Sequence, residues 1–309
     1  MTLQQLEYLV ALDTHRRFAK AAEMCNVTQP TLSTMIQRLE EELGVTLFDR
    51  SHQPVIPTAI GEKIIAQAQH ILSEARKVTD IIREEKDEIS GKIVVGVLPT
   101  IAPFLVPRMI PSMGDQFKQV DIEFVELTTS RCLEALSNCS IDMAIIASEA
   151  QTEGLEDRLL FYEEFLGYVS RNEKIFEQPL VRSSLVDPQR LWLLDEGHCF
   201  RDQLIRFCQL KDLNNRRVNY AQGSLQAFMH LVESGQGSTF IPALALSTLS
   251  PEQKKLIRPF AKPRPVREIR LAYRADFVRN SLKELISKLV RRVVPEEMLT
   301  LSVDQTIAR

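Results

Sequence analysis

Two cysteines near residue 200 are the side chains of this chain best suited to redox chemistry. Cys199 and Cys208 lie in the stretch GHCFRDQLIRFC, and Cys199 stands at the expected start of a helix. The helix dipole there favours a thiolate, and His198 and Arg201 supply neighbouring cations or hydrogen-bond donors. A thiolate is the form of cysteine that attacks peroxides. The alternative is that both cysteines are small, inert core residues, as free cysteines commonly are.

The spacing of the two cysteines limits how they could bond to each other. Nine residues of helix would separate the thiols by about 13 Å and place them on opposite faces. A disulfide requires Cα atoms within about 7 Å. The pair therefore cannot bridge while the helix is intact, and oxidation that joined the sulfurs would have to melt the segment.

The first 58 residues carry the signals of a helix-turn-helix domain followed by a wing. Thr28 is placed to cap a helix with Pro30 in its first turn, and Gly44 is placed to end it. Short strands at residues 45–48 and 55–56 would form the wing. The helix face and the wing would offer groups for base edges and phosphates, namely Gln29, Pro30, Thr31, Ser33, Thr34, Gln37, Arg38 and Arg50.

Charge placement separates DNA binding from the alternative, a plain three-helix domain with a solvated polar face. Residues 1–89 contain 10 Lys and Arg against 14 Asp and Glu, a net charge of −4. Residues 15–38 contain four basic residues and one acidic residue, a net charge of +3. The positive charge gathers on the helices that would meet DNA, which favours a double-stranded DNA operator as a partner.

A long helix is predicted over residues 59–89. Its apolar residues repeat at spacings of four and three, as Ile64, Ala68, Ile71, Ala75, Val78 and Ile82. Such a seam on a rod of about 45 Å is typical of a helix that pairs with a second copy. The alternative is a single amphipathic helix lying on its own domain. The pattern favours a dimer.

From Lys92 onward the chain alternates apolar, β-branched runs with helical stretches, which predicts an α/β domain with a parallel sheet. We expect two lobes in residues 90–309: lobe I from about 90–160 and 269–295, and lobe II from about 161–268. Strands are expected at residues 191–197 and 216–221, among others. The residues after Pro295 are expected to form a loosely held tail.

Motifs along the N-terminal stretch, within residues 6–62, resemble those of the LysR-type transcriptional regulators. They are LEYLVAL, then FAKAAEMCNVTQPTLSTMIQRLEEELGVTLFDR, then TAIGE. The resemblance covers nearly the full chain. It implies a winged helix-turn-helix at residues 1–58, a linker and dimerisation helix at 59–89, and a regulatory domain at 90–309 like a periplasmic binding protein of two α/β lobes. The wing departs from the pattern, because SHQPVIPT offers only His52 as a basic residue.

The stretch GHCFRDQ…FC resembles the hydrogen-peroxide-sensing branch of that family. The resemblance implies that Cys199 is the peroxidatic thiol and Cys208 the resolving thiol. Thr100 and Thr129 each follow an apolar strand, where ligands bind α/β sheets. The candidate residues of the peroxide pocket, from the resemblance and from their proximity in sequence to Cys199, are Thr100, Thr129, His198, Arg201, Asp202 and Arg267.

These observations predict a transcription factor switched by hydrogen peroxide through a Cys199–Cys208 disulfide. We expect a homodimer or homotetramer that alters promoter contacts with RNA polymerase. One alternative keeps the regulator but makes its signal a small metabolite bound between the lobes by Thr100 and Thr129. Another is a thiol peroxidase that turns over at Cys199, although the DNA-reading half would then have no purpose.

Composition excludes several other classes of protein. The chain of 309 residues is 44% hydrophobic with a net charge of −3, which fits an ordinary globular protein of about two domains. No apolar run approaches the roughly 20 residues of a membrane helix, so no membrane partner is expected. The N-terminus places its charge after its apolar stretch, whereas a signal peptide has the reverse order. This order predicts a cytoplasmic protein. No metal-ligand spacing or phosphate-binding loop is present, so neither a metal nor a cofactor is expected.

Overall fold

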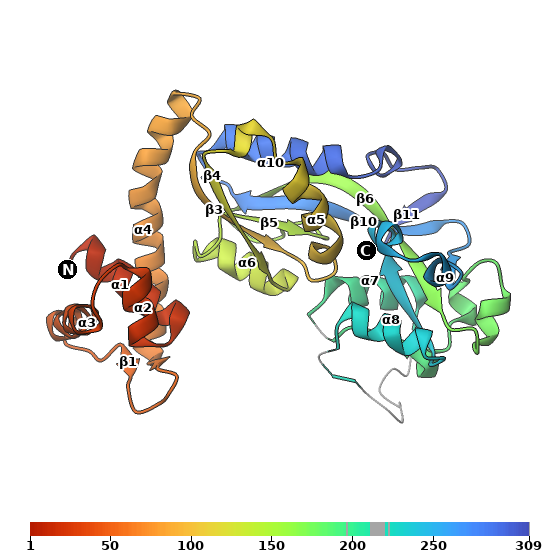
Figure 1. The fold of residues 1–309 in the computed structure, drawn as a ribbon, viewed down its shortest axis with the longest axis horizontal. Helices are drawn as coiled ribbons and strands as arrows, with labels where there is room; N and C mark the ends of the chain where they lie inside the picture. Colours follow the sequence, from red (N-terminus) through yellow and green to blue (C-terminus); the bar gives the residue numbers. More distant parts are fainter. Residues whose placement is uncertain (196, 211–219, 222, 309) are drawn as a thin grey trace. The chain divides into compact units, whose positions relative to one another are not determined.

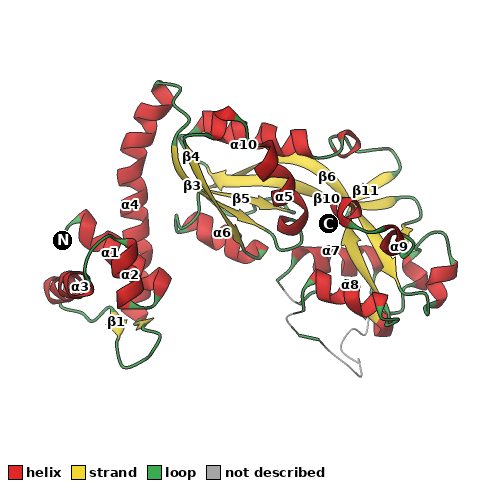
Figure 2. Ribbon diagram, in the orientation of Figure 1, coloured by secondary structure: helices red, strands yellow, loops and turns green. Residues whose placement is uncertain are grey.

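A computed structural model describes residues 1–195, 197–210, 220–221 and 223–308 (Figure 1). The chain forms two compact units. One consists of Met1–Glu88 with Ser137–Ser140, and the other of Ile89–Leu136 with Ile141–Arg309. The first is almost wholly helical, whereas the second combines helices with a sheet (Figure 2).

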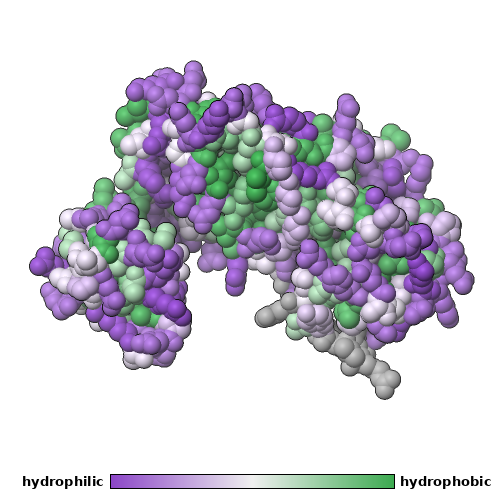
Figure 3. Space-filling view, viewed as in Figure 1, coloured by the Kyte–Doolittle hydropathy of each residue, from purple (hydrophilic) through white to green (hydrophobic). Residues whose placement is uncertain are grey.

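The N-terminal unit is a helix-turn-helix domain with a short wing. Its helices are α1 (Leu3–His15), α2 (Phe18–Met24) and α3 (Gln29–Leu43), and its wing strands are β1 (Phe48–Asp49) and β2 (Ile56–Pro57), which pair antiparallel. Thr28 caps α3 by accepting from the Thr31 N–H, and Gly44 ends it with φ of +69°. Leu32, Ile36 and Leu39 are fully buried, so the 4-3 stripe of α3 packs inward as the sequence predicts. On the face seen in Figure 3, hydrophilic side chains of this unit are interspersed with apolar ones.

The long helix α4 spans Ala59–Glu85 and is somewhat shorter than the predicted 59–89. Thr58 caps it by accepting from the Gly61 N–H at 3.0 Å. Its C-terminal half exposes apolar side chains, since Val78 is 63% and Ile82 is 52% exposed. Val78 and Ile82 belong to the predicted seam. Over the last two turns of α4, the seam is therefore not covered by the rest of the N-terminal unit.

The second unit is built on one mixed sheet, so the prediction of a parallel sheet was wrong. The strand order is β4-β3-β5-β10-β6-β8-β7, with β11 paired to β10 and β9 to β6. The pairs β3/β4, β3/β5, β7/β8 and β10/β11 are parallel, and the other pairs are antiparallel. The bounds are β3 (Gly91–Val97), β4 (Val120–Glu126), β5 (Met143–Ile146), β6 (Leu155–Val169), β7 (Leu191–Trp192), β8 (Ser238–Pro242), β9 (Ile257–Pro259), β10 (Arg264–Arg274) and β11 (Gln305–Ile307).

The antiparallel pairs arise because two long strands cross the predicted boundary between the lobes in opposite directions. β6 is 15 residues long and β10 is 11, and they pair from Val266↔Glu164 to Arg274↔Leu155. Their register shifts between Ile269 and Arg270. Helices flank the sheet: α5 (Ala102–Ser112), α6 (Thr129–Ser137), α7 (Cys199–Cys208), α8 (Leu225–Glu233), α9 (Pro251–Lys254) and α10 (Asn280–Val293), with a 3-10 segment, η5 (Ala243–Thr248).

The residues after Pro295 are not the loose tail that the sequence suggested. β11 pairs with β10 in parallel, matching Gln305 to Arg264 and Ile307 to Val266. Ala308 donates its N–H to the Val266 carbonyl at 2.8 Å and is 3% exposed. A three-residue strand is too short to show a two-residue period in the sequence, so the pairing was hidden.

Two other predicted strands, at residues 191–197 and 216–221, are not found as complete strands among the described residues. The run at residues 191–197 forms a strand only at β7, and the residues described beyond it are irregular. The predicted strand at 216–221 lies mostly outside the described residues. Within the part of the chain that the structure describes, no helix is both long and apolar enough to cross a bilayer.

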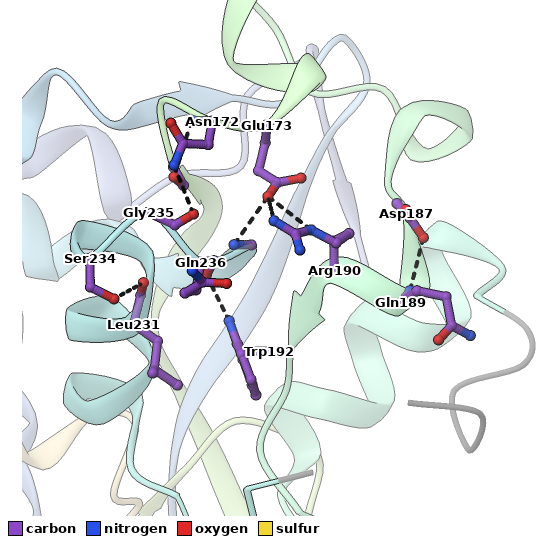
Figure 4. Close-up of polar contacts among 12 residues, drawn as sticks. Asn172, Glu173, Asp187, Gln189, Arg190, Trp192, Leu231, Ser234, Gly235 and Gln236 are labelled. Atoms are coloured by element: carbon purple, nitrogen blue, oxygen red, sulfur yellow. Dashed lines mark hydrogen bonds and ion pairs between the residues drawn. The ribbon is translucent and has the colours of Figure 1, made fainter. Parts of the chain in front are cut away.

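Glu173 holds together several segments around β7 and β8 (Figure 4). Its Oε1 accepts from Arg190 Nε at 3.0 Å and from the Gly237 N–H at 3.1 Å. Trp192 Nε1 donates to the Gln236 carbonyl at 2.8 Å in the same turn. These bonds fix the turn that leads into β8 against the start of β7.

We predict that Gly61→Ala destabilises the N-terminal unit. A Cβ at residue 61 would lie 2.0 Å from the Leu47 carbonyl oxygen, so the backbone must shift. The expected loss is about 1–3 kcal/mol in the free energy of unfolding. Gly114→Ala is the control, because its Cβ would meet nothing within 4 Å. Thermal unfolding of both variants measures the difference, and equal stability would contradict the close approach.

Candidate functional site

The two cysteines of the sequence motif mark the two ends of helix α7. Cys199 is its first residue and Cys208 its last, and both thiols are free. At 1.5 Å per residue, the nine steps between them span about 13 Å along the helix axis. Cys208 belongs to a core cluster with Phe165 and Phe200, whereas Cys199 packs against a different cluster around β3 and β5. Each sulfur is therefore held on its own side of an intact helix.

Arg267 is the buried charge of this region and is 0% exposed. Its guanidinium donates to Thr100 at two points, to Oγ1 at 2.9 Å and to the backbone carbonyl at 3.1 Å. It also donates twice to Glu163 Oε2, at 3.0 and 2.7 Å. The guanidinium carbon lies 4.9 Å from the Phe200 ring centroid, one residue beyond Cys199. Two of the predicted pocket residues, Thr100 and Arg267, are thus in direct contact beside the start of α7.

Glu163 completes this buried network, and the sequence analysis missed it. The carboxylate is 1% exposed, and its Oε1 accepts the Leu244 N–H at 3.1 Å. Arg267 therefore has a fully paired counter-ion, as a buried charge requires. A signal was present in the sequence: residue 163 lies between Phe161 and Phe165 on one face of a strand, both of them buried.

Burial dominates the protonation of both thiols. It raises the pKa of the Cys199 thiol, whereas Arg267, the Thr129 hydroxyl and the Phe200 N–H act in the opposite direction. We expected the helix start to favour a thiolate, and the net shift is the reverse, because a charge loses solvation inside the fold. Burial also raises the pKa of Cys208 to about 12. Cys208 is thus protonated at neutral pH in this structure.

Thr129 offers an unused polar group close to Cys199. Its Oγ1 is buried and has no hydrogen-bond partner within the described structure. It nevertheless lies near enough to Cys199 to favour the thiolate. A buried hydroxyl without a partner is costly unless a ligand or water satisfies it. The hydroxyl is therefore placed to donate to the Cys199 sulfur.

The remaining predicted pocket residues face two separate cavities. His198 and Thr100 line a cavity of about 350 Å³. Asp202 lines a second cavity of about 420 Å³ together with Cys199. Burial lowers the pKa of His198, so its imidazole is neutral at neutral pH. Arg201 donates its backbone N–H to the His198 carbonyl at 2.9 Å, and its side chain lines neither of these two cavities.

The DNA-reading residues predicted on α3 lie mostly on its exposed face. Ser33 is half-buried, and the exposed members are Gln29, Pro30, Thr31, Thr34, Gln37 and Arg38. Gln37 donates to Glu41 Oε1 at 3.0 Å, one turn further along. These short polar groups are separated from the core by the buried stripe of α3.

Arg50 differs from the prediction, because it already has an intramolecular partner. It donates to Glu40 Oε2 at 2.7 Å and lies over the Phe18 ring at 5.3 Å. The sequence analysis missed Glu40, whose Oε1 also accepts the Leu47 N–H at 2.7 Å. Glu40 thus ties α3 to the start of the wing.

The chain combines a helix-turn-helix unit, a long helix and an α/β unit that carries a thiol site. This combination defines the class of signal-responsive DNA-binding regulators. Family models agree. The LysR substrate binding domain matches residues 86–294, and the bacterial regulatory helix-turn-helix protein of the lysR family matches residues 3–62. The DNA-binding transcriptional dual regulator OxyR of Escherichia coli K12 is 32% identical over 94% of this chain and 95% of its own length.

Solved structures give the same answer. OxyR from Porphyromonas gingivalis is 57% identical, covers 71% of this chain and all of its own, and has a TM-score of 0.68. A full-length OxyR variant from Pseudomonas aeruginosa is 33% identical, covers 94% of this chain and 98% of its own, and has a TM-score of 0.76. The chain therefore belongs to the LysR family of bacterial transcriptional regulators, in its OxyR group.

We predict that Glu163→Ala destabilises the second unit strongly. The change leaves the Arg267 guanidinium buried without its counter-ion, which should cost about 3–5 kcal/mol in the free energy of unfolding. The control is Glu123→Ala, whose ion pair with Lys92 is half exposed and 2.7 Å long. Its loss should cost about 0–1 kcal/mol. Denaturant unfolding measures both, and a similar cost for the two variants would refute the assignment.

We also predict a steep pH dependence for alkylation of Cys199. Because burial raises its pKa above the ordinary value of 9.0, the thiolate fraction increases throughout the neutral range. The rate with iodoacetamide should rise about tenfold per pH unit from pH 7 to 9. A plateau below pH 8, measured by mass spectrometry of the alkylated peptide, would show that Arg267 and Thr129 outweigh burial.

Proposed function

We propose that this regulator is switched by hydrogen peroxide through Cys199 and Cys208. The Cys199 thiolate attacks peroxide, becomes a sulfenic acid and releases water. Cys208 then attacks that sulfur, and a disulfide forms with loss of a second water. The observation that carries the proposal is the position of the two thiols at opposite ends of α7, with Cys208 buried in one cluster and Cys199 packed against another.

Each neighbour of Cys199 contributes differently to the attack of the thiolate on peroxide. Arg267 stabilises the thiolate, and its bonds to Thr100 and Glu163 fix the guanidinium in place. The unpartnered Thr129 hydroxyl supplies a hydrogen bond to peroxide near the sulfur. We assign Asp202 to the wall of this pocket, because it shares a cavity with the thiol. His198 lines the separate cavity that also contains Thr100, and Arg201 lines neither, so we give these two residues no direct contact with peroxide.

The second step requires α7 to unfold at least in part. A disulfide needs Cα atoms within about 7 Å, and nine helical steps exceed that distance. Removing Cys208 from its cluster also uncovers a thiol that burial keeps unreactive. Oxidation therefore rebuilds the segment, and the rebuilt segment is the signal passed to the DNA-binding unit.

The output is a change in how the protein holds DNA. We assign residues 1–58 to DNA contact, 59–89 to dimerisation and 90–309 to sensing. Contact with a double-stranded operator comes from α3 through the exposed residues described above, with Ser33 at their edge. The exposed seam of α4, including Val78 and Ile82, fits pairing of two copies, and two such dimers would make a tetramer. Altered promoter geometry would then change contact with RNA polymerase.

The protein acts as a cytoplasmic sensor and not as an enzyme in this account. One oxidation per molecule suffices to switch a regulator, whereas a thiol peroxidase must be reduced and react again. The raised pKa of Cys199 and the burial of Cys208 both disfavour rapid turnover. Neither a metal nor a cofactor has a part in the proposed chemistry.

The test is oxidation of the reduced protein with one equivalent of hydrogen peroxide, followed by mapping of thiols by mass spectrometry. We expect one new disulfide, between Cys199 and Cys208. Cys199→Ser should abolish the response, and Cys208→Ser should stop at the sulfenic acid, trapped by dimedone. Failure to find the bridge in wild-type protein would refute the redox mechanism, and a full response in Cys199→Ser would require another sensor.

We predict that Arg38→Ala weakens operator binding in both redox states. Its exposed guanidinium on α3 is placed for phosphate, so its loss should weaken binding to all sequences and reduce the salt slope by about one. Lys118→Ala is the control, since its side chain is exposed in the second unit and pairs with Asp115, three residues away. Fluorescence anisotropy at several salt concentrations measures both variants. An unchanged salt slope for Arg38→Ala would show that Arg38 does not contact a phosphate.

A further inference from the structure

The last described residues of the chain are bonded to the sheet at both of their ends. We name residues 304–308, which include β11, the C-terminal strap. The Arg264 N–H donates to the Asp304 carbonyl at 2.7 Å, and the Ala308 N–H donates to the Val266 carbonyl at 2.8 Å. Between these two bonds, β11 pairs with β10 in parallel. The C-terminal strap therefore lies along the first three residues of β10.

Side chains at the outer end of the C-terminal strap add contacts to a second strand. Gln305 Nε2 donates to Glu164 Oε1 on β6 at 2.6 Å, and Arg264 pairs with the same oxygen at 2.8 Å. Asp304 forms an ion pair with Lys262, whose side chain is 69% exposed. A partly buried hydrogen bond to a carboxylate contributes more than an exposed ion pair. Gln305 is therefore the main side-chain anchor of the C-terminal strap.

The inner end of the C-terminal strap is buried with the helix that separates the two thiols. Ala308 is 3% exposed and belongs to the core cluster that also contains Phe200, Leu204 and Cys208 of α7. A side chain in such a cluster stays buried only while the other members remain in place. The burial of Ala308 therefore depends on the intact packing of α7.

The C-terminal strap also faces one side of α7 across a cavity. Cys199, Asp202 and Arg206 are three and four residues apart, so they lie on one face of the helix. They line the same cavity as Ile307 and Ala308. The inner end of the C-terminal strap thus borders α7 from its first residue to its last turn.

Contacts that exist only while α7 is intact favour the reduced state. The Cys199–Cys208 bond requires Cα atoms within about 7 Å, so the cluster around Cys208 must come apart before it forms. A segment that binds the intact arrangement more tightly than the rebuilt one shifts the equilibrium away from the disulfide. The bonds of the C-terminal strap to β10 and β6 hold Ala308 in that cluster. Because β11 has only three residues, few bonds must break for it to open locally.

We propose that the C-terminal strap is a latch that opposes disulfide formation, because it stabilises α7 in the reduced state and is released when Cys208 reaches Cys199. The inference rests on the redox function proposed above. The C-terminal strap has no part in the attack on peroxide, which oxidises Cys199 by two electrons to the sulfenic acid. It acts on the second step, in which the Cys208 sulfur attacks the Cys199 sulfur. The S–S bond forms, the S–O bond breaks, and the hydroxide leaves as water with the Cys208 proton.

Two variants weaken the attachment of the C-terminal strap. Gln305→Ala removes the bond to Glu164 and leaves Arg264 paired with that carboxylate. A chain that ends at Asp304 lacks β11 altogether. Val303→Ala is the matched control, because Val303 immediately precedes the C-terminal strap and is 100% exposed.

Rapid mixing of each reduced protein with excess hydrogen peroxide separates the two steps. Quenching with iodoacetamide and mass spectrometry give the loss of the free Cys199 thiol and the gain of the bridged peptide. We expect Gln305→Ala to leave the first rate within about twofold of wild type and to speed disulfide formation about fivefold, with a larger effect in the shortened chain. Titration in glutathione buffers should move the equilibrium toward the disulfide by a similar factor. Val303→Ala should match wild type in every measurement.

Unfolding of both redox forms separates a latch from a residue that only stabilises the fold. Release of a latch lowers the stability of the reduced form more than that of the disulfide form, because the disulfide form has already lost the contacts of the C-terminal strap. A residue needed by both forms lowers both equally. For Gln305→Ala, the difference between the two losses should equal the shift found in the glutathione titration.

The outcomes are distinguishable. Absence of the disulfide in the oxidised wild-type protein overturns both the proposed function and the latch. A disulfide that forms in wild type at the same rate and equilibrium as in Gln305→Ala leaves the proposed function standing and overturns the latch. Equal loss of stability in both redox forms also overturns the latch. If the shortened chain does not fold, Gln305→Ala decides alone.

Discussion

One intact helix, α7, keeps two sulfurs from meeting, and its packing in the second unit holds that helix in place. α7 begins at Cys199 and ends at Cys208, and it buries Phe200, Leu204 and Cys208 in the second unit. The rise of a helix is fixed by its backbone hydrogen bonds, so the distance between its ends cannot be shortened by side-chain rotation. A chemical bond between the two sulfurs is therefore incompatible with the packing seen here. In the proposed mechanism this fold is the reduced state, and formation of the disulfide selects a second one.

The buried network of Arg267, Glu163 and Thr100 connects this helix to the sheet. Arg267 lies on β10, Glu163 on β6, and Thr100 follows β3, so three strands meet at one guanidinium. The same guanidinium faces the ring of Phe200 on α7. Burial raises the pKa of Cys199 and Arg267 lowers it, so the reactivity of the sulfur depends on how well the network is formed. Arg267 thus links the packing of the sheet to the pKa of the Cys199 thiol.

Local sequence signals predicted those parts of the protein that local forces determine. Thr28, Pro30 and Gly44 define α3 through capping and backbone preference, and the structure places them at those ends. The start of α7 at Cys199 was expected on similar grounds. Contacts between distant residues were not visible. Glu163 and Arg267 are 104 residues apart, and Glu40 and Arg50 pair across the start of the wing. Strand direction in the mixed sheet and the short β11 also depend on distant partners.

The most direct test of the account is amide hydrogen exchange across α7 in the reduced protein and in the Cys199–Cys208 disulfide form. In the reduced state, the amides from Gln203 to Cys208 donate within the helix and should be protected. These amides should lose protection once the bond has formed, while the amides of the β6–β10 pairing keep theirs. A bridged protein in which residues 199–208 retain the same protection would contradict this expectation, because the sulfurs would then have met without any rebuilding of the helix.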